Sequence, residues 1–140
     1  MSRVEGAGNL TACYQCSACV AECPAAQLCG DFNPRLIVLA ALLGVGELLV
    51  EKDSVIWQCT TCYKCYERCP QGTHPIEVIT ACKNLAAAIG NAPEEITALH
   101  DTVAGNATLI MPSAAIEKRR GELGLGPVPA PAEDLERLLE

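Results

Sequence analysis

The sequence predicts a mainly α-helical fold, and three observations support this prediction. Apolar residues recur at helical spacing in two long stretches, residues 34–43 and 75–89. Asn, Ser, Pro and Gly stand where these helices would begin and end. The alternation of apolar and polar residues that is typical of strands is almost absent. Because half of the chain is apolar but only 4% is aromatic, the core must consist of Ala, Leu, Ile and Val.

The first long helix is predicted to begin at Pro34. Asn33 is a favourable N-cap, and proline suits the first helical turn. The apolar face of this helix consists of Leu36, Leu39, Ala40 and Leu43. Gly44 can end the helix with a left-handed cap. Residues 47–50 are expected to form a turn, and the Asp-Ser pair at 53–54 to cap a short helix that leads into the next segment.

A second long helix is predicted after residue 73. Thr73 and Pro75 are start signals, and Gly90 is a stop signal. The apolar face here consists of Ile76, Ile79, Leu85, Ala86 and Ile89. A further helix should begin after Pro93, where two glutamates favour the positive end of the helix dipole, and end at Gly105.

The last third of the chain divides into a helix and a tail. Residues 108–111 are expected to be extended, and Ser113 to cap a last helix. We predict one domain over residues 1–121 and a tail over residues 122–140 that docks on a partner. Its final segment, 132–140, is short and amphipathic. Three prolines impose an extended run on the start of the tail: Pro127, Pro129 and Pro131.

Ten cysteines are the most informative feature of the sequence. Eight of them form two copies of the pattern C-x2-C-x2-C-x3-C-P. We call the copy with Cys13, Cys16, Cys19 and Cys23 the first motif, and the copy with Cys59, Cys62, Cys65 and Cys69 the second motif. Disulfide scaffolds, zinc modules and iron–sulfur proteins all use many cysteines. The start of the chain lacks the basic and apolar runs of a secretory signal, so we expect a reducing, cytoplasmic compartment. That expectation favours metal ligands over disulfides.

The spacing of the cysteines separates zinc from iron–sulfur clusters. Structural zinc usually takes two C-x2-C pairs, whereas a third cysteine at the same interval and a fourth before proline are typical of [4Fe–4S] proteins. In that pattern the fourth cysteine of each run ligates the other cluster. We therefore predict two [4Fe–4S] clusters with interlocked ligands. Cluster 1 takes Cys13, Cys16, Cys19 and Cys69, and cluster 2 takes Cys59, Cys62, Cys65 and Cys23.

Several other residues have two interpretations each. Cys29 and Cys82 are spare ligands or redox thiols, or else small buried hydrophobes, which is commoner for free cysteine. His74 tunes a cluster or is a loop or cap residue, and neither it nor His100 has the partners of a catalytic base. Four residues of the second motif could tune a cluster: Thr60, Thr61, Tyr63 and Tyr66. The alternative, which we favour, is that the tyrosines shield it from water.

Composition and missing motifs exclude other functions. The net charge of −7 argues against nucleic acid, whose phosphates need Lys and Arg. The apolar stretch 36–50 is shorter than the roughly 20 residues of a membrane span, so we expect no membrane insertion. The sequence has no complete G-x-G-x-x-G, no phosphate loop and no nucleophile elbow. We therefore predict an electron carrier without an active site of its own.

Three segments resemble one known family, the C subunits of heterodisulfide reductase: CYQCSACVAECP at residues 13–24, IWQCTTCYKCYERCP at 56–70 and EKRRGELGLGPVP at 117–129. The resemblance implies an α-helical ferredoxin fold, as in the iron–sulfur proteins of succinate dehydrogenase and fumarate reductase. It also implies that the eight motif cysteines are the ligands of two [4Fe–4S] clusters.

The resemblance further implies a role within an oxidoreductase complex. The C subunit of the family relays electrons from the flavin-bearing A subunit to the catalytic B subunit. In methanogenesis the complex reduces the mixed disulfide of coenzyme M and coenzyme B, and its flavin bifurcates electrons from a hydrogenase or a formate dehydrogenase. Residues 25–32, AAQLCGDF, are less basic than in the family and contain Cys29. A related complex with another substrate therefore stays open as an alternative. A free ferredoxin and a structural cysteine module for protein interaction stay open as well.

Overall fold

The computed structural model describes residues 7–126, and the chain divides into two compact units, Met1–Pro93 and Glu94–Glu140. The described part of the first unit contains short 3₁₀ helices, labelled η, and α-helices. They are η1 (Ala7–Ala12), α1 (Ala18–Ala21), α2 (Pro24–Leu28), α3 (Pro34–Leu42), η2 (Gly46–Leu49), η3 (Val55–Gln58), α4 (Lys64–Glu67) and α5 (Pro75–Ala88). The second unit contains α6 (Glu94–Asn106) and α7 (Ala114–Glu122). No strand occurs within residues 7–126, as the sequence predicts.

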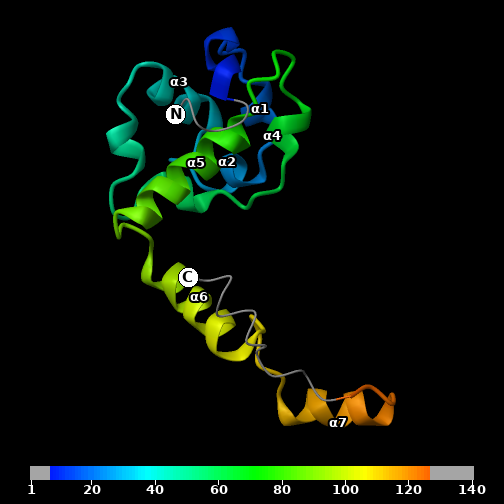
Figure 1. Ribbon diagram of the computed structural model, residues 1–140. Helices are drawn as coiled ribbons and strands as arrows, with labels where there is room; N and C mark the ends of the chain where they lie inside the picture. Colours follow the sequence, from blue (N-terminus) through cyan, green and yellow to red (C-terminus); the bar gives the residue numbers. More distant parts are fainter. Residues whose placement is uncertain (1–6, 127–140) are drawn as a thin grey trace. The chain divides into compact units, whose positions relative to one another are not determined.

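The core of the first unit lies between α3 and α5, which pack side by side (Figure 1). Val38 of α3 and Ala86 of α5 are fully buried. Phe32 and Ile56, from the segments before α3 and within η3, complete the core. Burying such side chains is worth roughly 1.5–3 kcal/mol each for the larger ones. The two long helices therefore form the scaffold on which the cysteine segments are placed.

Both helices begin and end where the sequence predicts. The Asn33 side chain caps α3, because its Oδ1 accepts hydrogen bonds from the backbone N–H groups of Arg35 and Leu36, at 3.1 and 3.2 Å. Gly44 follows α3 with φ of +75°, and Gly90 follows α5 with φ of +80°. After both helices the chain closes in a Schellman motif, in which two N–H groups bond back to carbonyls of the last turn.

His74 is the N-cap of α5, which agrees with its interpretation as a loop or cap residue. Its φ of +48° is left-handed. Its side chain makes no capping hydrogen bond. Pro75 supplies the first helical position, as predicted. A left-handed residue before a proline turns the chain sharply, so α5 begins at Pro75, shortly after the second motif ends.

The second unit consists of two helices in its described part. Helix α6 continues one residue past the predicted stop at Gly105, and α7 begins at the predicted cap, where Ser113 Oγ accepts the N–H of Ile116 at 3.4 Å. Residues 108–110 of the segment 108–111, which we expected to be extended, form bends. Within the described residues, neither helix contains a buried residue.

The boundary between the two compact units lies between Pro93 and Glu94. Residues 127–140, with the predicted proline run and amphipathic segment, lie outside the described residues. The division into residues 1–121 and a tail of 122–140 therefore stays a prediction.

Candidate metal centre

Both cysteine motifs have the same unusual backbone. Gln15 and Ser17 of the first motif have φ values of +55° and +67°, and Thr61 and Tyr63 at the matching positions of the second have +55° and +60°. Left-handed backbone is uncommon for residues other than glycine, and it is especially unfavourable for a β-branched residue such as threonine. Such strain is typically kept at functional sites. Alternating left- and right-handed residues turn successive N–H groups into a concavity that attracts negative charge.

Short helices follow these loops and place the third cysteine of each motif. Helix α1 begins after Ser17 and contains Cys19, and α4 begins after Tyr63 and contains Cys65. The two helices are in contact with each other. The matching segments of the two motifs therefore lie next to each other, although they are far apart in the sequence.

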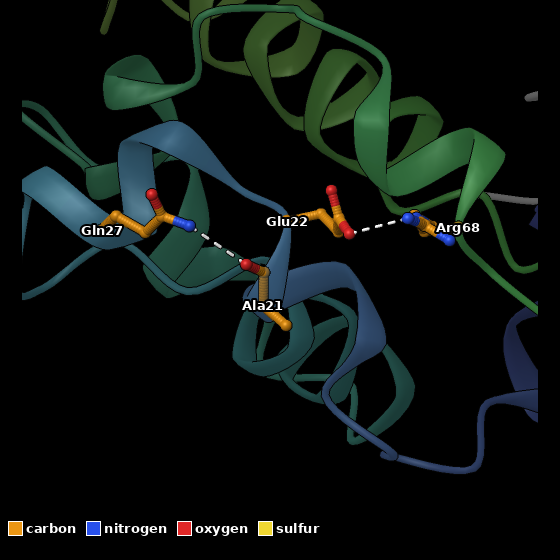
Figure 2. Close-up of polar contacts among 4 residues, drawn as sticks. All are labelled: Ala21, Glu22, Gln27 and Arg68. Carbon is orange, nitrogen blue, oxygen red and sulfur yellow. Dashed lines mark hydrogen bonds and ion pairs between the residues drawn. The ribbon is translucent and has the colours of Figure 1, made fainter.

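An ion pair connects the two motifs just before their fourth cysteines (Figure 2). Arg68 Nη2 lies 2.9 Å from Glu22 Oε1, and these residues hold equivalent positions in the repeat. Next to this pair along the chain, Gln27 Nε2 donates a hydrogen bond of 3.0 Å to the carbonyl of Ala21. Because Arg68 and Glu22 are 61% and 40% exposed, we expect the pair to contribute at most about 1 kcal/mol.

One cavity, which we call the first site, is surrounded by three cysteines of the first motif and the last of the second. It has about 360 Å³ of space, part of it open to solvent. Its cysteines are Cys13, Cys16, Cys19 and Cys69. Arg35, Val38 and Pro75 contribute to the rest of its wall.

A second cavity, the second site, has the reciprocal composition and about 290 Å³ of space. Its cysteines are Cys59, Cys62, Cys65 and Cys23. Phe32, Ile76 and Ile79 give it an apolar wall. The structure thus gathers the eight predicted ligands into two groups of four, with the fourth cysteine of each motif in the cavity of the other.

The thiols present a ligand set that suits a cluster. All ten cysteines are free thiols. Among residues 7–126, no three His, Cys, Asp or Glu side chains converge on a point that one metal ion could occupy. Four cysteines line each site, and four cysteine thiolates are the ligand set of a [4Fe–4S] cluster.

Burial and mutual repulsion act on the thiols at both sites. Burial raises the pKa of Cys19 to about 11, and the nearby Cys13, Cys69 and Cys16 raise it further by like charge. Burial also raises the pKa of Cys65 to about 12, again with repulsion from neighbouring cysteines. In the metal-free chain these two thiols are therefore protonated at neutral pH. A bound metal group that neutralises the thiolate charge would relieve this repulsion.

The pKa of Cys69 is shifted in the opposite direction, downwards. Its partial burial would raise the pKa, but hydrogen bonds to the sulfur outweigh this effect and the pKa is lowered. The backbone N–H of Thr73 donates to Cys69 Sγ at 3.2 Å, and the N–H groups of Gln71 and His74 also favour the thiolate. Gly72, which lies among these donors, has a left-handed φ of +59°. The segment that starts α5 therefore also stabilises a thiolate at the first site.

Sequence reasoning did not identify two residues at the first site. Gln15 Nε2 donates a hydrogen bond of 3.2 Å to Cys13 Sγ, and Arg35 Nη1 donates one of 3.1 Å to Gln15 Oε1. Gln15 lies inside the first motif, so its position was a possible signal. Arg35 is separated from it by 20 residues, and nothing in the local pattern indicates the contact.

The remaining cysteines lie outside both cavities within the described residues. Cys82 is 1% exposed and packs in the core, and burial raises the pKa of its thiol. Cys29 is half-buried at the end of α2 and packs against the core. Neither residue contributes to the wall of the first or the second site.

The histidines and tyrosines have mostly local contacts. The His74 ring stacks on Tyr66 with centroids 3.7 Å apart, and His74 Nδ1 lies 3.6 Å from Glu77 Oε1. His100 lies on α6 with Nδ1 3.2 Å from Asp101 Oδ1. Tyr63 and Thr60 contribute to the wall of the second site. Tyr66 and Thr61 do not line that cavity.

Comparison with known proteins agrees with this geometry. Residues 9–73 match the family model of the 4Fe-4S dicluster domain. That range contains all eight motif cysteines and excludes Cys82. The mainly α-helical ferredoxin fold predicted from the sequence is thereby confirmed.

Relatives among well-characterised proteins extend the likeness to most of the chain. The chain is 34% identical over 134 residues to the iron-sulfur C subunit of the CoB–CoM heterodisulfide reductase of Methanopyrus kandleri. This match covers 94% of the chain and 68% of that protein. It is 36% identical, again over 134 residues, to a second C-type iron-sulfur protein of this reductase, from Methanocaldococcus jannaschii, covering 94% and 69%. The chain belongs to the family of heterodisulfide reductase C subunits.

Other members of the family have names that differ in the electron donor. The C2 subunit of the H2/formate:CoB-CoM heterodisulfide,ferredoxin reductase of Methanococcus maripaludis is 40% identical over 119 residues, which is 84% of this chain. The chain spans only 62% of the length of that relative. Among the described residues, no helix is long and apolar enough to cross a membrane.

Proposed function

We propose that this chain is the electron-transfer subunit of a heterodisulfide reductase complex and that it holds two [4Fe–4S] clusters. The cluster ligands are Cys13, Cys16, Cys19 and Cys69 at the first site, and Cys59, Cys62, Cys65 and Cys23 at the second. The observation that carries the proposal is the pair of four-cysteine cavities, each built from both motifs, within the range that matches a dicluster domain.

The protein binds the clusters, shields them from water and leaves them accessible to partners. When bound, each cluster supplies the uptake and release of one electron. Cys23 and Cys65 are buried, so one side of the second site is protected from water. Cys16 and Cys62, the second cysteine of each motif, are exposed. Each site therefore has one edge at the surface, where an electron can enter from or leave to a partner.

The partners we propose follow the family. The chain relays electrons from the flavin-bearing A subunit to the catalytic B subunit, which reduces the coenzyme M–coenzyme B heterodisulfide in methanogenesis. The flavin bifurcates electrons that a hydrogenase or a formate dehydrogenase supplies. Related proteins are named as parts of such reductases, with H2 or formate in the name of one. Exposed apolar side chains on the second unit, such as Ile110 and Leu123, are suited to an interface with a partner protein.

Two alternatives share the two cluster sites with this proposal and differ from it in substrate or partners. A related complex with another substrate would use the same two sites, and a free ferredoxin would use them without fixed partners. Separating native extract by size distinguishes the free carrier, because a component of a complex elutes with that complex and a free ferredoxin elutes alone. Identification of the co-eluting proteins and assay of heterodisulfide reduction then distinguish the substrate.

Metal content tests the cofactor directly. Two clusters require about eight irons and eight sulfides per chain. Anaerobically purified protein should contain these amounts, and a chain that contains zinc in their place would contradict the proposal.

The interlocked ligands are tested by two double variants with the same number of lost thiols. Cys69→Ser with Cys16→Ser removes two ligands from the first site, so the second cluster should remain with about four irons. Cys69→Ser with Cys62→Ser removes one ligand from each site, so both clusters should be damaged. If each motif instead bound its own cluster, the two variants would exchange these results.

A further inference from the structure

The two sites have the same motif and the same backbone, but their walls differ in charge. The wall of the first site contains the guanidinium-bearing side chain of Arg35. The wall of the second site has the apolar Phe32, Ile76 and Ile79 and no arginine or lysine. No Asp or Glu among the described residues lines either cavity. The positive charge of Arg35 is therefore not neutralised by a carboxylate in the wall of the site.

Arg35 acts on a cysteine sulfur through one intermediate residue. Arg35 Nη1 donates to Gln15 Oε1 at 3.1 Å, which holds the Gln15 amide so that its Nε2 donates to Cys13 Sγ at 3.2 Å. Arg35 Nε is buried and has no hydrogen-bond partner among the described residues. The cap at Asn33, which bonds to the backbone N–H of Arg35, fixes the turn of α3 from which this side chain extends.

The second site has a cation nearby but in a different role. Lys83 Nζ donates to the backbone carbonyl of Cys59 at 3.0 Å and lies 5.6 Å from the centroid of the Trp57 ring. Lys83 does not line the cavity. Thr61, which occupies the position of Gln15 in the second motif, does not line it either.

Backbone donors differ between the sites in the same direction. The N–H groups of Thr73, Gln71 and His74 favour the thiolate of Cys69 at the first site, whereas Cys65 at the second site has a backbone hydrogen bond from Ile76. The side chains of Arg35 and Gln15 add a further stabilisation of negative charge at the first site.

We propose that Arg35 and Gln15 are positioning residues that raise the reduction potential of the first site above that of the second. This inference rests on the proposed function, because it requires a cluster at both sites. Reduction adds negative charge to a cluster, and hydrogen bonds to its sulfurs or a nearby cation stabilise the reduced form. The first site is thus the one that is reduced first, and the second is the one that gives up its electron more readily.

The test is a redox titration of the full-length holoprotein, followed by electron paramagnetic resonance. The signal of each site is assigned with Cys16→Ser and Cys62→Ser, since a changed ligand alters the signal of its own site. In the unaltered protein the first-site signal should develop at the higher potential. Arg35→Gln and Gln15→Asn should each lower the first-site midpoint and leave the second-site midpoint in place. Arg35→Lys, which keeps the charge, should restore part of the shift.

Lys52→Gln is the matched control, because it removes one exposed positive charge that lines neither site. It should move neither midpoint. The inference is overturned if the second site is reduced first, if the first-site midpoint is the same in Arg35→Gln and Gln15→Asn as in the unaltered protein, or if both midpoints move equally. A chain that holds no iron and sulfide would overturn the proposed function itself, and the inference with it.

Discussion

At the scale of single residues, the buried thiol of Cys82 tests which cysteines are structural. Its side chain packs in the core beside α3 and lies outside both sites. We expect Cys82→Ser to lower the free energy of unfolding by about 1–3 kcal/mol, because the hydroxyl would be buried without a partner. Iron content should not change. Denaturant titration and iron analysis measure the two effects.

Cys82→Ala is the control for this prediction, since it removes the sulfur without adding a polar group. It should destabilise the protein less than serine does. A loss of iron in either variant would show that Cys82 is a ligand after all. Because burial raises the pKa of this thiol, it should also react slowly with alkylating reagents in the folded protein at pH 8.

The raised pKa values of Cys19 and Cys65 predict how metal binding depends on pH. Both thiols, with pKa values of about 11 and about 12, carry a proton at neutral pH in the metal-free chain. Ligation requires the thiolates, so cluster assembly releases protons and becomes less favourable as the pH falls. Clusters should therefore be lost to a chelator faster at pH 6 than at pH 8. Equal rates of iron release at the two pH values would contradict this prediction.

At the scale of elements, the cap of α3 connects stability to the first site. Asn33→Ala removes the acceptor of two backbone N–H groups and should cost about 1 kcal/mol of folding free energy. Arg35 lies in the first turn of that helix, so fraying should also weaken its bond to Gln15 and lower the first-site midpoint. Asn33→Asp retains the acceptor and should be close to the unaltered protein in both measurements. Full stability in Asn33→Ala would show that the cap contributes nothing.

Elements with strong local signals were predictable from the sequence, and elements that depend on distant contacts were not. Helices α3 and α5 have a cap or a proline at one end, a glycine at the other and an apolar face between. Helices α1, α2 and α4 have only four or five residues, too few to show a helical period. Left-handed residues within the motifs direct two of them, and the usual preferences for that conformation do not indicate Thr61 or Tyr63.

The candidate sites also combine features that were predictable from the sequence with features that depend on distant contacts. The membership of the two groups of four cysteines could be predicted, because the spacing of the motifs is specific. The hydrogen bonds that distinguish the sites could not, because the contact of Arg35 with Gln15 arises from the packing of α3 against the first motif. Likewise, the sequence contains no local signal that aims the backbone N–H groups of Gln71, Thr73 and His74 at the sulfur of Cys69.

At the scale of the whole molecule, all ten cysteines lie in the first compact unit, Met1–Pro93. That unit also contains the described core and both cavities. Exposed apolar side chains occur on both units, but the described helices of the second unit contain no buried residue, so their apolar side chains are not needed for a core. Cluster binding and assembly with partners should therefore be separable by cutting the chain between the two units.

A fragment of residues 1–93 should keep both clusters, because it retains every predicted ligand and the core that positions them. Asn91, whose Nδ2 donates to the carbonyl of Val50 at 2.8 Å, stays in the fragment and holds the end of α5 against the residue that follows η2. Iron and sulfide per chain and the two midpoint potentials should match those of the full chain prepared in parallel. Co-purification with the partner proteins should be lost, since the apolar side chains of the second unit are gone. A fragment without iron would show that the second unit is needed for the sites, and a fragment that still assembles would place the interface on the first unit.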